Sequence, residues 1–170
     1  MILCTECYIQ RKNPHDRGTS SGIHQTLMLH RNKKSDDINE GKWVGLGGKL
    51  EAGESPEQCL LREVHEEAGV ALTDYRLRGM VTFLPIGLPE EALLIFIFTA
   101  DSFEGEVDFE GCQEGTLQWV DSDSILDLNL WEGDRLFWKW MTDNKTSDRL
   151  FSARFVYDRE ELTEYDVTFY

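Results

Sequence analysis

Short apolar stretches, separated by polar segments rich in turn-forming residues, run along most of the chain and predict β-strands. Polar residues at 11–22 separate the first two stretches, which predicts a hairpin with a long loop, and 33–41 is expected to be a charged loop. The expected strands are Ile2–Gln10, His24–Arg31, a glycine-rich extended piece at Trp43–Lys49, Tyr75–Leu84, Glu91–Ala100, Thr116–Asp121, Phe151–Tyr157 and Asp166–Tyr170.

A helix from Ser55 to Ala68 is the strongest helical signal in the sequence. Ser55 is a good N-cap, Pro56 suits the first helical position, and Gln58 completes a capping box. Gly69 suits a left-handed C-terminal stop. Apolar residues recur at helical spacing and are expected to face the core: Leu60, Leu61, Val64 and Ala68.

A second helix is expected at Asp134–Met141, where Phe137, Trp140 and Met141 form an apolar stripe. No tandem repeat or low-complexity linker interrupts the chain. Several strands with few helices predict a layered α+β or α/β domain built on a mixed sheet, and α+β is the expected class. The 170 residues are expected to form a single domain, 1–170, around one core.

A formal charge of −15 narrows the classes of partner. Proteins that bind nucleic-acid polymers or anionic membranes need basic patches, so neither partner is expected. A nucleotide substrate stays possible if a metal ion lies between protein acids and phosphates. The longest apolar run, 92–98, is too short to span a bilayer, and the first residues do not resemble a secretory signal, so we expect a cytoplasmic protein.

Four cysteines require a choice between metal binding and free thiols. Cys4 and Cys7 have the spacing of half a zinc site, but no second pair follows them. On a strand, the two side chains would also point to opposite faces. Free thiols in a reducing compartment are the favoured interpretation.

Three glutamates crowd the second half of the first predicted helix. Glu63 and Glu67 lie four residues apart on one face, and Glu66 flanks the same ridge. Like charges at this spacing cost roughly 0.2–0.5 kcal/mol per pair. Two structural explanations exist, a solvated acidic face and a network neutralised by Arg62. Taken alone, the run is explained as well by one of these as by a functional site.

The residues around these glutamates form a spaced pattern, G-x5-E-x7-R-E-V-x-E-E-x-G-V, which begins at Gly48. It is filled by Gly48, Glu54, Arg62, Glu63, Val64, Glu66, Glu67, Gly69 and Val70. The segment is similar at every fixed position to the Nudix box, and the chain is identified as a member of the Nudix hydrolases. The resemblance implies a Nudix-type α/β/α sandwich with a mixed central sheet.

The chemistry of the family agrees with the residue types in this pattern. Carboxylates on one helix ridge suit Mg²⁺, with Mn²⁺ as an alternative, and the ion orients phosphates and lowers the pKa of a bound water. Arg62 can orient a neighbouring carboxylate, and Lys49 follows glycines that let backbone approach the phosphates. The resemblance implies a metal-binding and catalytic set of Gly47 (by its carbonyl), Glu63, Glu66, Glu67 and Glu114, with Glu66 as a ligand or an outer acid.

Glu114 is the best match to a glutamate that MutT-type members contribute from a later loop, either to the metal site or as the base. It lies in Gly111–Gly115, just before a predicted strand. The alternative is an exposed acid in a turn.

The segments 27–34 and 40–49 resemble the MutT and MutX-type branch of 8-oxo-dGTP diphosphatases. Trp131 and Asp134 fall where family members specific for oxidised purines carry a tryptophan and acids that contact the base. Trp131 could stack on a purine or simply pack, and Asp134 could bind the base or act as a helix N-cap. Gly133 replaces an acid and Val44 an asparagine of those members, although Val44 and Leu46 are expected to line the pocket.

The expected reaction is Mg²⁺-dependent hydrolysis of purine nucleoside triphosphates such as 8-oxo-dGTP to a monophosphate and pyrophosphate, by a monomer or homodimer. Two alternatives remain open. One is a Nudix pyrophosphatase for another nucleoside diphosphate-linked substrate such as ADP-ribose. The other is a Nudix module that binds nucleotides without turnover, although such modules commonly lose acids that this chain keeps.

Overall fold

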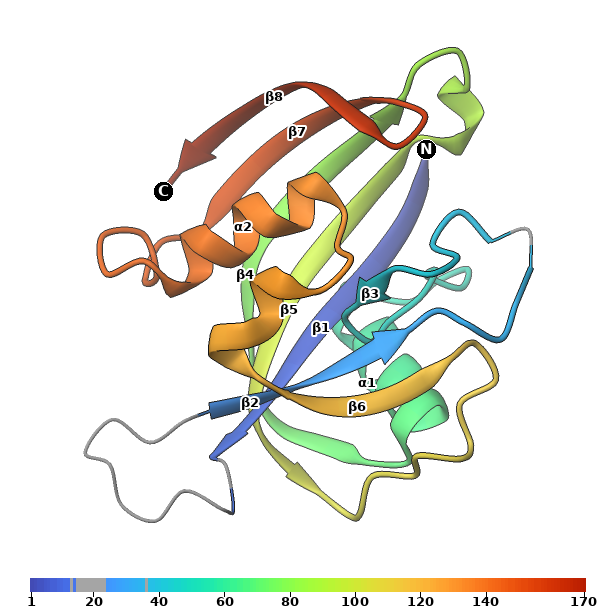
Figure 1. The fold of residues 1–170 in the computed structure, drawn as a ribbon, viewed down its shortest axis with the longest axis vertical. Helices are drawn as coiled ribbons and strands as arrows, with labels where there is room; N and C mark the ends of the chain where they lie inside the picture. Colours follow the sequence, from blue (N-terminus) through green and yellow to red (C-terminus); the bar gives the residue numbers. More distant parts are fainter. Residues whose placement is uncertain (13, 15–23, 36) are drawn as a thin grey trace.

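A computed structural model describes residues 1–12, 14, 24–35 and 37–170. Figure 1 shows a long curved sheet with helices packed against it. The strands are β1 (Ile2–Lys12), β2 (His24–His30), β3 (Trp43–Val44), β4 (Ala71–Pro85), β5 (Leu93–Glu104), β6 (Thr116–Asp121), β7 (Phe151–Asp158) and β8 (Glu161–Phe169). The α-helices are α1 (Pro56–Ala68) and α2 (Glu132–Thr142), and two short 3-10 helices are η1 (Pro89–Glu91) and η2 (Ser122–Asp127).

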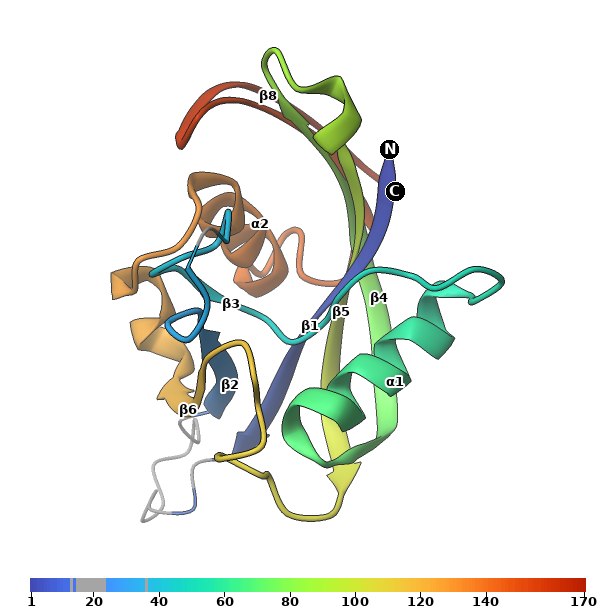
Figure 2. The same cartoon turned by 90° about the vertical axis from the view of Figure 1, so that its right-hand side faces the viewer.

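The sheet is mixed and has the strand order β3-β2-β1-β5-β4-β7-β8. β6 pairs with the edge of β2 that is opposite to both β1 and β3. The β1–β5 and β4–β7 pairs are parallel, and the other named pairs are antiparallel. Figure 2 shows α1 and α2 on opposite faces of the β1–β5–β4 part of the sheet. The expected α+β sandwich with a mixed central sheet is therefore confirmed.

The glycine-rich segment 45–50 separates β1 from β2 over the first half of β1. β1 pairs with β2 only from Ile9 onward. Before that point its backbone bonds to the glycine-rich segment: Cys7 and Leu46 exchange two hydrogen bonds of 2.7 and 2.9 Å, and the Thr5 N–H donates to the Gly48 carbonyl at 2.9 Å. In the extended piece predicted at 43–49, only the first two residues form a strand, β3. The rest of the piece pairs with β1 through isolated bridges.

Two apolar clusters lie on the two faces of the sheet. One packs against α1 and contains Cys7, Leu60 and Val64, and the other packs against α2 and contains Tyr8 and Phe137. Because side chains alternate along a strand, the even-numbered residues of β1 point to the face that carries α2. This alternation decides which β1 side chains reach the site described below.

The first helix agrees closely with the sequence prediction. The Ser55 hydroxyl accepts the Gln58 N–H, the Gln58 side chain accepts the Ser55 N–H, and Gly69 ends the helix with φ of +71°. The second helix begins two residues earlier than predicted, with Trp131 at the N-cap position. Asp134 therefore lies inside the first turn, and the alternative in which it caps the helix is wrong.

The strands are longer than predicted where the sheet bends. β4 extends four residues before Tyr75, and its pairing with β5 contains register shifts that interrupt the apolar pattern. Within the predicted loop at 11–22, residues 11 and 12 belong to β1, and 13 and 15–22 lie outside the described residues. No helix in the described part of the chain is long and apolar enough to cross a membrane.

Candidate active site

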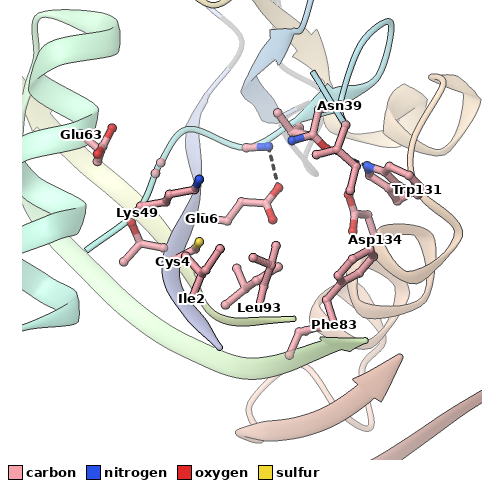
Figure 3. Close-up of a pocket in the computed structure, with 18 of the residues that line it drawn as sticks. Ile2, Cys4, Glu6, Asn39, Lys49, Glu63, Phe83, Leu93, Trp131 and Asp134 are labelled. Carbon is pink, nitrogen blue, oxygen red and sulfur yellow. Dashed lines mark hydrogen bonds between the residues drawn. The ribbon is translucent and has the colours of Figure 1, made fainter. Parts of the chain in front are cut away.

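One cavity of about 710 Å³ is lined by Gly47, Glu63 and Glu114 of the predicted metal-binding set and by the predicted base-binding residues Trp131 and Asp134. Glu66 and Glu67 are not among its lining residues. Its walls come from β1, the glycine-rich segment, α1, β4, β5, α2 and β7. Figure 3 shows Glu63 and Lys49 toward one side, Trp131 and Asp134 on the opposite side, and Glu6 between them. The volume falls within the range of about 300–1,000 Å³ that is typical of small-molecule sites.

Glu67 is the most buried of the predicted metal-binding carboxylates, with 6% of its surface exposed. Its Oε2 accepts the Gly47 N–H at 2.8 Å, whereas its Oε1 is buried and has no hydrogen-bond partner among the described residues. Burial is the main cause that raises the pKa of Glu67 to about 8, and the hydrogen bond from Gly47 opposes this increase. A buried oxygen without a partner is costly in the absence of a ligand.

Arg62 holds the neighbouring acids of the helix in place. Its Nη1 donates to Glu63 Oε1 at 2.6 Å, and its Nε donates to Glu54 Oε1 at 2.7 Å. Hydrogen bonds from Arg62 lower the pKa of Glu54 to about 2. The same guanidinium reaches Glu66 only at 3.4 Å, and the Glu66 side chain is 59% exposed. The proposed neutralising network therefore exists, and it fixes Glu63 at the cavity wall.

Two glycines allow the loop to fit between β1 and this ridge. A Cβ at Gly47, where φ is +151°, would lie 2.1 Å from the Thr5 carbonyl oxygen. A Cβ at Gly48 would lie 2.5 Å from the Glu63 carboxylate. The backbone at 47–48 therefore lies directly against the acids of α1, as a shared ion site requires.

The residues present fit a divalent cation. Glu63 and Glu67 supply hard oxygen donors from one helix ridge, and the buried Oε1 of Glu67 is a donor without a partner. Within residues 1–12, 14, 24–35 and 37–170, no group of three or more His, Cys, Asp or Glu side chains is already gathered as a metal site. The acids are instead paired with arginine or backbone, so cation binding would exchange some of these partners.

Glu114 lines the same cavity, but its carboxylate is paired with two basic side chains. Its carboxylate accepts from the Arg31 guanidinium, and the Lys34 ammonium lies 2.7 Å from its other oxygen. The Glu114 side chain is only part-exposed, so it is not simply a solvated acid in a turn. Its direct role in the metal site stays a prediction.

Trp131 forms part of the opposite wall and is also a packing aromatic. It is 8% exposed, its Nε1–H donates to Asn39 Oδ1 at 2.8 Å, and it contacts Phe83 and Tyr157 edge to face. The Lys42 ammonium lies 4.8 Å from the ring centroid, a cation–π distance. Both interpretations from the sequence therefore agree with its position.

The two apolar residues expected to line the pocket differ in position. Val44 lies at the cavity wall. Leu46 is fully buried in the apolar cluster beneath α1, because its backbone pairs with Cys7 and its side chain faces the core. The expectation that Leu46 contacts the substrate is therefore wrong.

Two acids face each other in the interior of the cavity, and only Asp134 was singled out from the sequence. Glu6, on β1, also lines the wall, and Figure 3 shows its side chain extending toward Asp134. Burial raises the pKa of both carboxyls, and the nearby charge of Glu6 raises the pKa of Asp134 further. The only hint in the sequence is an acidic residue within an apolar strand. The role of Glu6 depends on the glycine-rich segment beside β1, which the sequence does not place there.

Known proteins resemble this chain over most of its length. A family model described as NUDIX domain matches residues 19–141. An oxidized purine nucleoside triphosphate hydrolase of Danio rerio is 36% identical over 112 residues, 66% of this chain and 70% of the relative. The enzyme of the same name from Mus musculus is 28% identical over 144 residues, 84% and 86% of the two chains.

Among solved structures, a MutT protein from Bacillus halodurans matches with a TM-score of 0.78 and 29% identity, covering 98% of this chain and 97% of that one. Together with the acidic ridge of α1 and the glycine loop against it, these similarities show that the chain belongs to the NUDIX domain family, as a MutT-type Nudix hydrolase.

Proposed function

We propose that this chain hydrolyses purine nucleoside triphosphates, including oxidised ones such as 8-oxo-dGTP, to a nucleoside monophosphate and pyrophosphate. The observation that carries the proposal is a cavity with Glu63 of α1 at one end and Trp131 with Asp134 at the other. This arrangement allows one ligand to place its phosphates and its base at opposite ends. The names of the zebrafish and mouse relatives support the same substrate class.

Mg²⁺ is the proposed cofactor, and Mn²⁺ should substitute for it. Glu63 and Glu67 would hold the ion, and the Gly47 carbonyl and Glu114 are further candidates. When bound, such an ion neutralises phosphate charge and lowers the pKa of a coordinated water. The protein contributes the orientation of Glu63 through Arg62, and Lys49 offers a positive charge at the same end of the cavity.

The base end differs from the family pattern in a way that the packing explains. A Cβ at Gly133 would lie 2.6 Å from the Phe155 ring and 2.9 Å from the Tyr157 hydroxyl. The Gly133 N–H also donates to that hydroxyl at 2.8 Å. An acid therefore does not fit at Gly133, and Asp134 is the acid that α2 presents to the cavity.

Product analysis tests this proposal. The protein is incubated with 8-oxo-dGTP or dGTP, in Mg²⁺ or in EDTA, and the nucleotides, pyrophosphate and orthophosphate are quantified. We expect monophosphate and pyrophosphate in equal amounts, only with Mg²⁺. Release of diphosphate and orthophosphate would contradict the proposed site of attack. Turnover of ADP-ribose without turnover of either triphosphate would contradict the substrate class.

A further inference from the structure

Glu6 has no role in the metal-binding ridge, yet it places a carboxylate in the centre of the cavity. We infer that Glu6 determines base specificity, accepting hydrogen bonds from the edge of a guanine-type purine that carries N1–H and the 2-amino group. The inference rests on the proposed function and specifies its substrate class. It assigns a residue of the central strand that the sequence pattern did not single out.

One oxygen of Glu6 is fixed by hydrogen bonds, whereas the other remains available to a ligand. Glu6 Oε1 accepts the Gly45 N–H at 2.8 Å and the Tyr8 hydroxyl at 2.8 Å. Both bonds recorded for this side chain among the described residues fall on Oε1. A carboxylate accepts through both oxygens, so Oε2 retains its full acceptor capacity in a preset position.

The position on β1 directs this group into the cavity. Ile2, Cys4 and Glu6 alternate along the strand and all line the wall, and Tyr8, the next residue of the series, is buried beneath them. The glycine-rich segment supplies the donor at Gly45 because it bonds to β1 in place of β2. The orientation of the carboxylate is therefore built into the backbone.

Two facing acids favour a ligand that offers hydrogen-bond donors. Asp134 approaches from α2 on the opposite side, as Figure 3 shows. Burial raises the pKa of both groups, which reflects the cost of charge at this place. A ligand edge rich in N–H donors relieves that cost, whereas an edge of acceptors increases it.

Guanine-type bases present adjacent donors at N1–H and the 2-amino group, which matches a carboxylate. Adenine presents an acceptor at N1 beside its 6-amino donor. Oxidation at C8 leaves the N1–H and 2-amino edge unchanged, so this contact serves 8-oxoguanine and guanine alike. A buried acceptor that is positioned for a donor on the base disfavours bases without that donor, because the acceptor is then left without a hydrogen bond.

Glu6→Gln separates this role from a structural one. The glutamine retains an oxygen that can accept from Gly45 and Tyr8, and it replaces the ligand-facing acceptor with an NH₂ donor. A residue that only ties the glycine-rich segment to β1 would tolerate this change without altering base choice. The matched control is Glu91→Gln, which removes an exposed carboxylate at the cavity wall on η1.

The experiment measures kcat/KM for dGTP and dATP, together with calorimetric binding of dGMP and dAMP in EDTA. In Glu6→Gln we expect two ratios to fall about 10- to 100-fold, the size of a lost hydrogen bond to a charged group. One is the kcat/KM for dGTP divided by that for dATP, and the other is the affinity for dGMP divided by that for dAMP. Glu91→Gln should keep the wild-type ratios. Unchanged ratios in Glu6→Gln would overturn the inference.

The wild-type protein provides a test that does not depend on the variant folding. dIMP lacks only the 2-amino group, and it should bind at least about 10-fold more weakly than dGMP. Equal affinities would overturn the inference. Absence of triphosphate hydrolysis by the wild type would contradict the proposed function alone, because monophosphate binding would still report on Glu6.

Discussion

At the scale of single residues, Glu67 combines two unfavourable features in the metal-free protein. Its carboxyl is buried, and its Oε1 has no partner among the described residues. The same features become favourable when a cation reaches that oxygen. The residue is therefore better adapted to the bound state than to the empty one.

The raised pKa of Glu67 predicts how the metal-free protein responds to pH. The folded state retains a proton up to about pH 8, whereas the unfolded chain releases it near the ordinary value of 4.5. The unfolded state thus binds fewer protons between these values, and stability falls as pH rises from about 5 to 8. Thermal unfolding in EDTA, measured at several pH values, checks this expectation.

Glu67→Gln removes the titrating group and serves as the reference for that experiment. The difference in Tm between the variant and the wild type should increase in favour of the variant as pH rises from 5 to 8. Other buried acids, such as Glu6 and Asp134, contribute equally to both proteins and cancel. A difference that stays constant over this range would show that the carboxyl is already ionised when folded.

At the scale of elements, α1 is determined almost entirely by local sequence. Its N-cap serine, its capping-box glutamine and its left-handed glycine are all where the pattern predicted them. α2 begins two residues before its predicted start, because Trp131 at the N-cap position makes no side-chain cap bond and so gives only a weak local signal. The ends of a helix can be predicted where capping residues define them. They are harder to predict where only packing against the rest of the fold defines them.

Loss of the α1 cap should weaken the fold without changing the chemistry. Ser55→Ala removes the hydroxyl that accepts the Gln58 N–H and should cost about 1 kcal/mol of unfolding free energy, or roughly 2–4 °C in Tm. The control is Ser124→Ala, an exposed serine in η2. Calorimetry and kcat at 25 °C provide the two measurements. A Tm equal to that of the control would show that the cap contributes nothing.

At the scale of the whole molecule, the sheet brings together parts of the chain that no local pattern connects. The Nudix box predicted the acidic ridge because its residues are close in sequence. Glu6 was missed because its role depends on Gly45, which reaches β1 only through the insertion of the glycine-rich segment. Leu46 was misplaced for the same reason, since its pairing with Cys7 turns it toward the core.

The net charge of −15 implies a second role for the proposed metal ion, besides its contact with the acids of α1. A triphosphate is repelled by an acidic protein unless its charge is neutralised. Among the described residues, the basic side chains that line the cavity are Arg31, Lys49 and Arg62. Both arginines are already paired with glutamates. The structure thus favours binding of a metal–nucleotide complex over binding of the free nucleotide.

The most direct test of the central claim, that the glutamates of α1 hold a divalent ion for hydrolysis of a phosphate anhydride, is Mg²⁺-dependent pyrophosphate release by Glu63→Gln and Glu67→Gln. Glu57→Gln, the same change on the first turn of the same helix, is the control. We expect folded variants, by circular dichroism, with turnover reduced at least about 100-fold at positions 63 and 67 and unchanged at 57. Wild-type turnover in both folded ridge variants would contradict the account.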